Sequence, residues 1–309
     1  MPNQTATLDD AFQLGVTNAF TLAFQRMKPL LRAAVTEKEC AGEAVPASDI
    51  VGKVVASRIA GRQRSNPETR TNIKRRWLLY RDEIQVGTYI DKEDNLRLLR
   101  DPTSEYVQTY SAALARAIDE VIFGWEGQGG ILGTVVEGGS PGGAGKALPA
   151  ANTIADGNEG LTIAKIRKVR RDIAADDALE YGGVEICAAY HPHQLDNLLA
   201  LAEAASAGAS GLSPFEMPAL REGKLEGRFM GMNWIEHTGT PLKAGTTDIR
   251  KVAVWRKDCI KLGVWEDMQA KVFRDTSARM TPYLDVFARM DCVRDRDEGV
   301  RVIECKEVA

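Results

Sequence analysis

One stretch in the first half of the chain, residues 101–124, constrains the fold more than any other. Its apolar residues recur at steps of three and four, which places them on one face of an α-helix. Asp101 can cap the free N–H groups of the first turn, Pro102 suits the first helical position, and Gly124 is a typical helix stop. The sequence therefore predicts an amphipathic rod roughly 30 Å long, at about 1.5 Å per residue. The apolar face comprises Tyr106, Tyr110, Ala113, Leu114, Ala117, Ile118, Val121 and Ile122.

The composition is typical of a globular protein. With 309 residues, 44% hydrophobic and 27% charged, the chain can bury a sizeable core in about two domains. A net charge of −3 gives no overall attraction to nucleic acid or to a membrane. The five scattered cysteines form no CxxC pair and indicate free thiols in a reducing compartment. The acidic start and the absence of a long apolar run predict a protein kept in a cytoplasm, without a membrane partner.

The segments before the rod are expected to be extended or arm-like. Residues 8–35 have a helical pattern, which indicates either a helix packed on the core or an arm that needs a neighbouring subunit. Residues 36–50 are expected to be a linker. Residues 58–81 are strongly basic and lead into an extended stretch at 73–90, which together predict a projecting basic hairpin. Its charges could form a solvated face, bind nucleic acid with the help of interleaved Trp77 and Tyr80, or pair with an acidic surface of another subunit.

A glycine-rich segment follows the rod. Residues 124–145 contain ten glycines, and part of the segment is similar to a phosphate-binding loop. The GxxxxGK[ST] pattern fails, however, because Ser140 stands where the first glycine is needed and Ala147 where the magnesium-binding hydroxyl is needed. We therefore expect a flexible loop.

The second half of the sequence predicts a mixture of helices and strands. Residues 161–180 form a second amphipathic helix, capped by Thr162, whose basic residues precede its acidic ones and so oppose the helix dipole. Strands are expected at 183–190, 229–236, 251–255 and 260–265. The alternation of apolar and charged residues over 284–292 predicts a half-buried strand, and 300–305 is expected to return beside it as a terminal β-hairpin.

Motifs for catalysis are missing from the sequence. It has no GxSxG, HExxH, GxGxxG after a strand, or CxxC. His191 and His193 lie close together but have no third ligand nearby, which favours a structural or surface role. We therefore predict no enzyme activity, no cofactor and no metal site.

Several stretches in order resemble one family, the major capsid proteins of tailed bacteriophages with the Hong Kong 97-type fold. They are YIDKEDNLRLLRDPTSEYVQTYSAALARAIDEVIFG, GLTIAKIRKVRRDI, AAYHPHQLDNLLA, EGRFMGMNWIEHTGTPL, VAVWRKDCIKLGV and RMDCVRDRDEGVRVIEC. The resemblance covers most of the chain after about residue 58 and implies an α+β fold. It implies an N-terminal arm (1–57), an extended loop (58–103), a spine helix of the peripheral domain (104–125), an axial domain (126–269) and return strands of the peripheral domain (270–309).

The resemblance also implies roles and partners. The chain would form hexamers and pentamers of itself, build an icosahedral shell around double-stranded DNA in the virion, and assemble in the host cytoplasm. A portal protein and a separate scaffolding protein would be partners, because the short arm leaves no room for a cleaved scaffolding segment, and contact with DNA would be weak and nonspecific. No lysine–asparagine cross-link is expected. In this frame we expect basic loop residues to pair with acidic residues of the next subunit; the candidates are Arg70, Lys74, Arg75, Arg76 and Arg81 with Asp119, Glu120, Asp295, Asp297 and Glu298.

Two other classes remain open at this point. A cellular encapsulin-like compartment would share the fold but enclose cargo proteins rather than DNA. A basic-arm protein that binds nucleic acid would show affinity for DNA, with steep salt dependence, as an unassembled subunit.

Overall fold

The computed structural model describes residues 28–52, 54, 56, 71, 73–90, 103–176, 183–207, 225, 228–239, 242–244, 248–276 and 280–306. Most of the helix predicted within 8–35 lies outside these residues, since the description begins at residue 28. The candidate Arg70 lies outside them as well. The described chain forms two compact units. The ribbon unit consists of the described parts of Arg81–Ile118 and Glu266–Met290, and the sheet unit consists of those of Leu30–Tyr80, Asp119–Trp265 and Asp291–Ala309.

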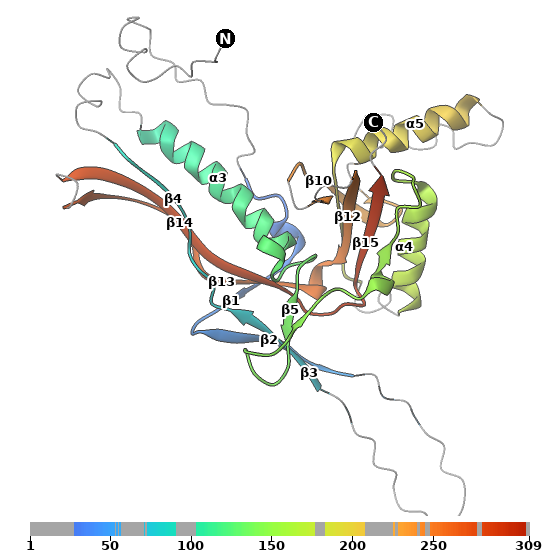
Figure 1. The fold of residues 1–309 in the computed structure, drawn as a ribbon, viewed down its shortest axis with the longest axis horizontal. Coiled ribbons are helices and arrows are strands. Elements are labelled where there is room, and N and C mark those ends of the chain that lie inside the picture. The colour runs from blue at the N-terminus through green and yellow to red at the C-terminus, as the bar shows by residue number, and fades with distance from the viewer. Residues whose placement is uncertain are drawn as a thin grey trace, which may run out of the picture. The chain divides into compact units, whose positions relative to one another are not determined.

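The predicted rod is helix α3, Thr103–Phe123 (Figure 1). Leu114, Ile118 and Ile122 are buried, as their spacing predicts. The helix ends at Gly124, whose φ of 116° lies in the left-handed region that a residue with a Cβ rarely adopts. The end of the helix therefore follows from the local sequence, whereas Asp101 and Pro102, the predicted start signals, lie outside the described residues.

The ribbon unit is built on long strands. Strand β4 (Ile84–Tyr89) pairs antiparallel with β14 (Thr281–Arg294), so that Val86 lies opposite Val286. Strand β13 (Ile260–Asp275) is the other neighbour of β14. Gly87 permits the close pairing of β4 with β14, because a Cβ there would lie 2.8 Å from the backbone carbonyl oxygen of Leu284.

A seven-stranded sheet forms the centre of the sheet unit. Its order is β7-β15-β12-β8-β10-β9, and β11 also pairs with β12. The bounds are β7 Thr153–Ile154, β8 Ile186–Tyr190, β9 Arg228–Phe229, β10 Met232–Glu236, β11 Lys243–Ala244, β12 Ile249–Arg256 and β15 Val300–Lys306. Helix α4 (Ile163–Ala175) and helix α5 (Pro192–Ala207) pack on one face of this sheet (Figure 1).

Successive side chains of the central strands point to opposite faces of the sheet, and each face packs against a different part of the unit. Ala188 of β8 and Val254 of β12 contribute to the core that holds the buried side of α4. Trp255, one position along, is also buried, and its indole N–H donates to the carbonyl of Ala34 at 2.9 Å. Both faces of the central strands are therefore covered within this unit, which explains why β8 is buried at every position.

A smaller sheet in the same unit has the order β2-β3-β5-β6. Its strands are β2 Ala44–Val51, β3 Ile73–Leu79, β5 Val135–Glu137 and β6 Gly145–Lys146. Strand β1 (Thr36–Glu39) pairs in parallel with the first part of β13, Lys261–Val264. The short 3-10 turns are η1 Arg32–Ala34, η2 Trp125–Gly127, η3 Ala150–Asn152 and η6 Lys257–Cys259.

Three sequence predictions require correction. The linker expected at 36–50 contains β1 and most of β2. The basic strand β3 pairs with β2 and β5, while β4 pairs with β14, so 73–90 is not one hairpin. The two last strands do not form a terminal hairpin either, because β14 lies between β13 and β4, whereas β15 lies between β7 and β12.

The glycine-rich segment is also different from the expected flexible loop: its second half contains β5 and the start of β6, and its first half is closely packed. The N–H of Gly130 donates to the carbonyl of Cys292 at 2.6 Å, and the N–H of Ile131 donates to the carbonyl of Ile122 at 3.0 Å. A Cβ at Gly130 would lie 2.4 Å from the nitrogen of Gly124. These glycines therefore permit close backbone packing between the end of α3 and β14.

Substitution of Gly130 tests this packing. Gly130→Ala is expected to lower the free energy of unfolding by about 2–5 kcal/mol, because it adds both a left-handed residue with a Cβ and a backbone clash. Gly127→Ala is the matched control: its φ of 76° is also positive, but nothing lies within 4 Å of the new Cβ. It should cost only about 1–2 kcal/mol. Urea denaturation measures both, and equal losses would contradict the packing role.

Candidate functional site

The first candidate site is a group of charged residues buried inside the sheet unit, which we call the ion cluster. It comprises Arg76 of β3, Glu137 of β5, Lys146 of β6, Arg294 at the end of β14, and Asp297 in the turn before β15. The cluster therefore joins three neighbouring strands of the smaller sheet, β3, β5 and β6, to the segment between β14 and β15.

Asp297 is the centre of the ion cluster. Its carboxylate accepts hydrogen bonds from Nη2 of Arg76 at 2.6 Å, from Nη1 of Arg76 at 2.9 Å and from Nε of Arg294 at 2.6 Å. Burial acts to raise the pKa of Asp297, but the bonds from the two guanidinium groups overcome it and lower the pKa to about 2. The carboxylate is therefore ionised throughout the physiological range and holds two arginines together.

Arg294 is fully buried, yet its donors are satisfied. Besides Asp297, it donates to the carbonyls of Ile131 at 2.8 Å and Gly133 at 3.2 Å in the glycine-rich segment. Burial lowers the pKa of Arg294 from its usual value, since the charged form loses its hydration. A buried guanidinium is tolerated because every side of it meets a carboxylate or a carbonyl oxygen.

Glu137 completes the cluster at its more exposed edge. It accepts from Nη2 of Arg76 at 3.1 Å and from Nζ of Lys146 at 2.8 Å. Burial works against the charged form of Glu137, and the bonds from Lys146 and Arg76 outweigh it, so its pKa is lowered. The cluster thus forms one network, in which two carboxylates and several backbone carbonyl oxygens accept the hydrogen bonds of three cations, rather than a set of isolated ion pairs.

The structure places several of the expected subunit-contact residues inside the subunit. Arg76 and Asp297 do pair, but within one chain. Arg75 makes a two-pronged pair with Asp49 on the neighbouring strand β2, at 2.5 and 2.7 Å. Asp295 is buried and accepts a hydrogen bond from the hydroxyl of Ser48. The sequence showed complementary charges but not that their partners lay in the same chain.

Asp119 was expected to pair with a basic residue of the next subunit, and its burial contradicts this prediction. It is fully buried and accepts from the backbone N–H groups of Leu30 at 3.2 Å and Leu31 at 3.1 Å. Nε2 of the buried His237 lies 3.5 Å from the same carboxylate, while Nδ1 of His237 accepts from the N–H of Gly239 at 2.9 Å. Asp119 therefore fixes the chain before η1 against α3, and it has no surface left for a neighbour.

The other expected contact residues remain near the surface. Lys74 and Glu298 are exposed, and Arg81 and Glu120 are half-buried. These four retain the exposure that a contact between subunits requires.

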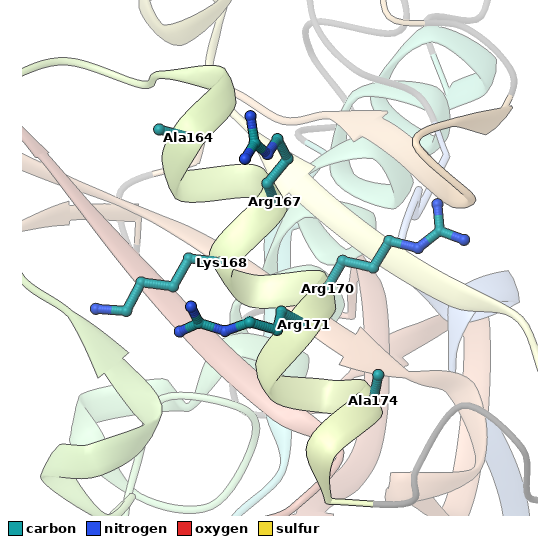
Figure 2. A pocket seen from close by; sticks show the side chains of 6 residues that line it. All are labelled: Ala164, Arg167, Lys168, Arg170, Arg171 and Ala174. Atoms are coloured by element: carbon teal, nitrogen blue, oxygen red, sulfur yellow. The ribbon is translucent and has the colours of Figure 1, made fainter.

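A second candidate site is the outer face of α4, which we call the basic face (Figure 2). Arg167, Lys168, Arg170 and Arg171 project from it, between Ala164 and Ala174, and line a shallow hollow of about 630 Å³. Thr162 caps this helix as predicted, accepting from the N–H of Lys165 at 3.3 Å. The sequence revealed the unusual charge order here, but the prediction assigned no site to it.

Metal-binding groups do not gather in the described residues. No cluster of three or more His, Cys, Asp or Glu side chains there could hold a metal ion. All five cysteines are free thiols, and burial raises the pKa of Cys187, Cys259 and Cys305 to about 12, so they are poor nucleophiles. Among the helices that are described, none is long and apolar enough to cross a membrane.

Comparisons with known proteins assign this architecture to a class. The fold matches the capsid of cyanophage P-SCSP1u at 15% identity and a TM-score of 0.61, over 99% of this chain and 96% of that one. It matches the capsid of Ralstonia phage GP4 at 14% identity and a TM-score of 0.63, over 95% of each chain. The capsid of cyanophage Pam1 matches at 13% identity and a TM-score of 0.63, over 99% of each chain. The protein thus has the mixed helix-and-sheet fold of phage shell proteins.

The family itself is shown by the sequence. Residues 8–307 match the family described as phage capsid protein, and the chain belongs to that family. It is a major capsid protein, the subunit of a phage shell. This family is one of structural proteins, in agreement with the predicted absence of catalysis. No curated protein sequence matches the chain closely enough to indicate a relative.

Proposed function

We propose that the protein assembles as hexamers and pentamers into an icosahedral shell of the Hong Kong 97 type, which encloses the double-stranded DNA of a tailed phage. One observation carries the assembly proposal: large apolar side chains are exposed at the far end of the β2–β3 pair. Val51 and Ile73 lie opposite each other there, and each is 60% exposed. Exposed apolar groups of this kind mark contact surfaces between proteins.

A second apolar surface is a suitable receiver for that end. In the ribbon unit, Met268 and Val272, which lie four positions apart and so on the same face of β13, are both exposed. We propose that the β2–β3 end of one subunit packs against this strand of the next, with Lys74 close to the contact. Arg70, Arg81, Glu120 and Glu298 are the remaining candidates for ion pairs around it, of the kind that guide orientation more than affinity.

The proposed domain assignment changes in two respects. Residues 58–103 remain the proposed extended loop, together with β2, and 104–125 the proposed spine helix of the peripheral domain. The proposed axial domain, 126–269, gains β15, because this strand pairs with β12 along seven residues, from Val300 opposite Trp255 to Lys306 opposite Ile249. The peripheral return strands within 270–309 are then limited to β14 and the end of β13.

The contents of the shell distinguish the proposal from its rival. Shells from phage-infected cells should contain DNA and carry a portal, and they should form with a separate scaffolding protein in the host cytoplasm. An encapsulin-like compartment would instead hold packed protein. Nuclease-protected DNA in purified particles, measured by absorbance and gel electrophoresis, supports the phage assignment, and protein cargo without DNA would contradict it.

A further inference from the structure

The orientation of α4 separates its two faces sharply. Ile166, Val169 and Ile173 are fully buried in the core of the sheet unit. The six residues of the basic face and its ends are all exposed, as Figure 2 shows for the side chains that project from the helix. Because the buried side fixes the helix, the four cations are held on one outward surface.

Most of the charge on the basic face is not neutralised. Within the residues that the structure describes, Arg167 and Lys168 make no hydrogen bond or ion pair. Arg170 donates to the carbonyl of Met230 at 2.7 Å, which satisfies one donor without cancelling its charge. Arg171 contacts Asp172 at 2.9 Å, and this is an exposed pair of small energetic value. The face therefore presents a net positive surface.

These cations do not stabilise their own helix. Arg167 and Lys168 stand before the middle of the helix and Arg170 and Arg171 just after it, and none lies in the last turn, where positive charge would stabilise the helix dipole. Lys165 is different, because it is buried and its Nζ donates to the carbonyls of Asp156, Glu159 and Gly160. Lys165 is thus accounted for by the fold, whereas the four exposed cations are not.

The chemistry of the face fits a polyanion better than a protein. Among the described residues, the large exposed hydrophobic side chains lie elsewhere and none is on α4. Protein interfaces are centred on buried aromatic, Met and Leu anchors, which this face lacks. Arginine forks match phosphate oxygens in pairs, and the small Ala164 and Ala174 leave the approach open at both ends.

The size of the face also fits a phosphate backbone. From Ala164 to Ala174 the helix rises about 15 Å, at about 1.5 Å per residue. One strand of duplex DNA advances about 3.4 Å per nucleotide, so this length follows about four phosphates. The four cations occupy the middle of this length, between Arg167 and Arg171, so their long side chains can reach a few successive phosphates of one strand without reading bases.

We propose that the basic face of α4 is a contact surface for the phosphodiester backbone of the enclosed DNA, and hence that it lies on the inner side of the shell. The inference rests on the proposed function for the identity of the polyanion. It goes further by naming the residues, Arg167, Lys168, Arg170 and Arg171, and by making the contact independent of base sequence.

The test compares DNA binding by the unassembled full-length chain and by Arg167→Gln/Lys168→Gln. Fluorescence anisotropy with a short duplex of mixed sequence is measured from about 50 to 200 mM NaCl. We expect the variant to bind about 10–100-fold more weakly at the lowest salt, and its slope of log affinity against log salt to be shallower by about 1.8, or about 0.9 for each lost contact. The control Lys271→Gln/Arg274→Gln removes two exposed cations from β13 and should keep the wild-type slope.

Three outcomes would overturn the inference: no binding by the wild type at low salt, an unchanged slope in the α4 variant, or loss of shells in that variant with DNA binding intact. The last outcome would assign the face to a contact between subunits. Shells are scored by electron microscopy in the same preparations. Failure of the wild type to form shells counts against the proposed function alone, since binding by the free subunit is measured separately.

Discussion

Replacing Asp297 by asparagine is expected to lower the free energy of unfolding by about 3–5 kcal/mol, because two buried guanidinium groups lose their shared counter-charge. Arg76 and Arg294 are both almost completely shielded from water, so neither can regain hydration without opening the cluster. The loss is measured by urea denaturation with tryptophan fluorescence. The substitution keeps the size of the side chain, so the effect is one of charge and not of packing.

Glu298→Gln provides the matched control. Glu298 is the next residue in the same turn but is exposed, and its neutralisation should change the free energy of unfolding by less than about 0.5 kcal/mol. Similar effects of the two substitutions would show that the ion cluster does not hold the turn in place.

The same cluster gives the direction of an acid dependence. The pKa of Asp297 is lowered from 3.8 to about 2 in the folded chain, so its ionised form stabilises the fold above pH 4. That contribution is lost as the pH falls from about 4 toward 2, as Asp297 becomes protonated in the unfolded and then in the folded chain. Asp297→Asn should lack this part of the acid dependence, and a wild-type and variant profile of equal steepness over this range would contradict the assignment.

The second large effect is expected on assembly and not on folding. Ile73→Asp places a charge in the exposed apolar end of the β2–β3 pair, where the side chain is 60% exposed and so contributes little to the subunit's own core. A charge there would remain buried without a partner in a subunit contact, which is strongly unfavourable. We expect a folded subunit that forms few or no shells.

Size-exclusion chromatography and electron microscopy measure this effect, and circular dichroism checks the fold. Ser140→Asp is the control, since it adds the same charge at an exposed position of the glycine-rich segment. Normal shells from Ile73→Asp would remove the β2–β3 end from the proposed interface. Unfolding of the variant would show that Ile73 serves the subunit's core instead.

The parts of the fold that could be predicted are those decided by neighbouring residues. The apolar period of α3, its stop at Gly124 and the Thr162 cap of α4 are local features, and the structure confirms all three. Strand β14 was likewise visible from its alternation, but the predicted half-burial is wrong, because Asp285 and Asp291 on its charged side are also buried. Its partners were not visible, because the choice between β15 and β13 depends on apolar faces that lie far apart in the sequence.

Charge and glycine patterns were ambiguous for a different reason. Complementary charges at Arg76 and Asp297 indicate a pair, but nothing local says whether that pair forms within one subunit or between two. Glycines at 129, 130 and 133 are equally suited to a flexible loop and to close packing, and only the approach of β14 decides between them. Strand β1 has the sequence TEKE, which contains no apolar residue from which a strand could be predicted. Such a polar sequence is suitable for an edge strand, and β1 lies at the edge of its sheet.

The most direct test of the shell assignment is electron microscopy of the full-length protein, purified after expression with the proposed scaffolding partner. The account predicts closed icosahedral particles of uniform size, in which α3 and the seven-stranded sheet can be fitted into every subunit. Discrete monomers or small oligomers of correctly folded protein, without closed particles under any assembly condition, would contradict it.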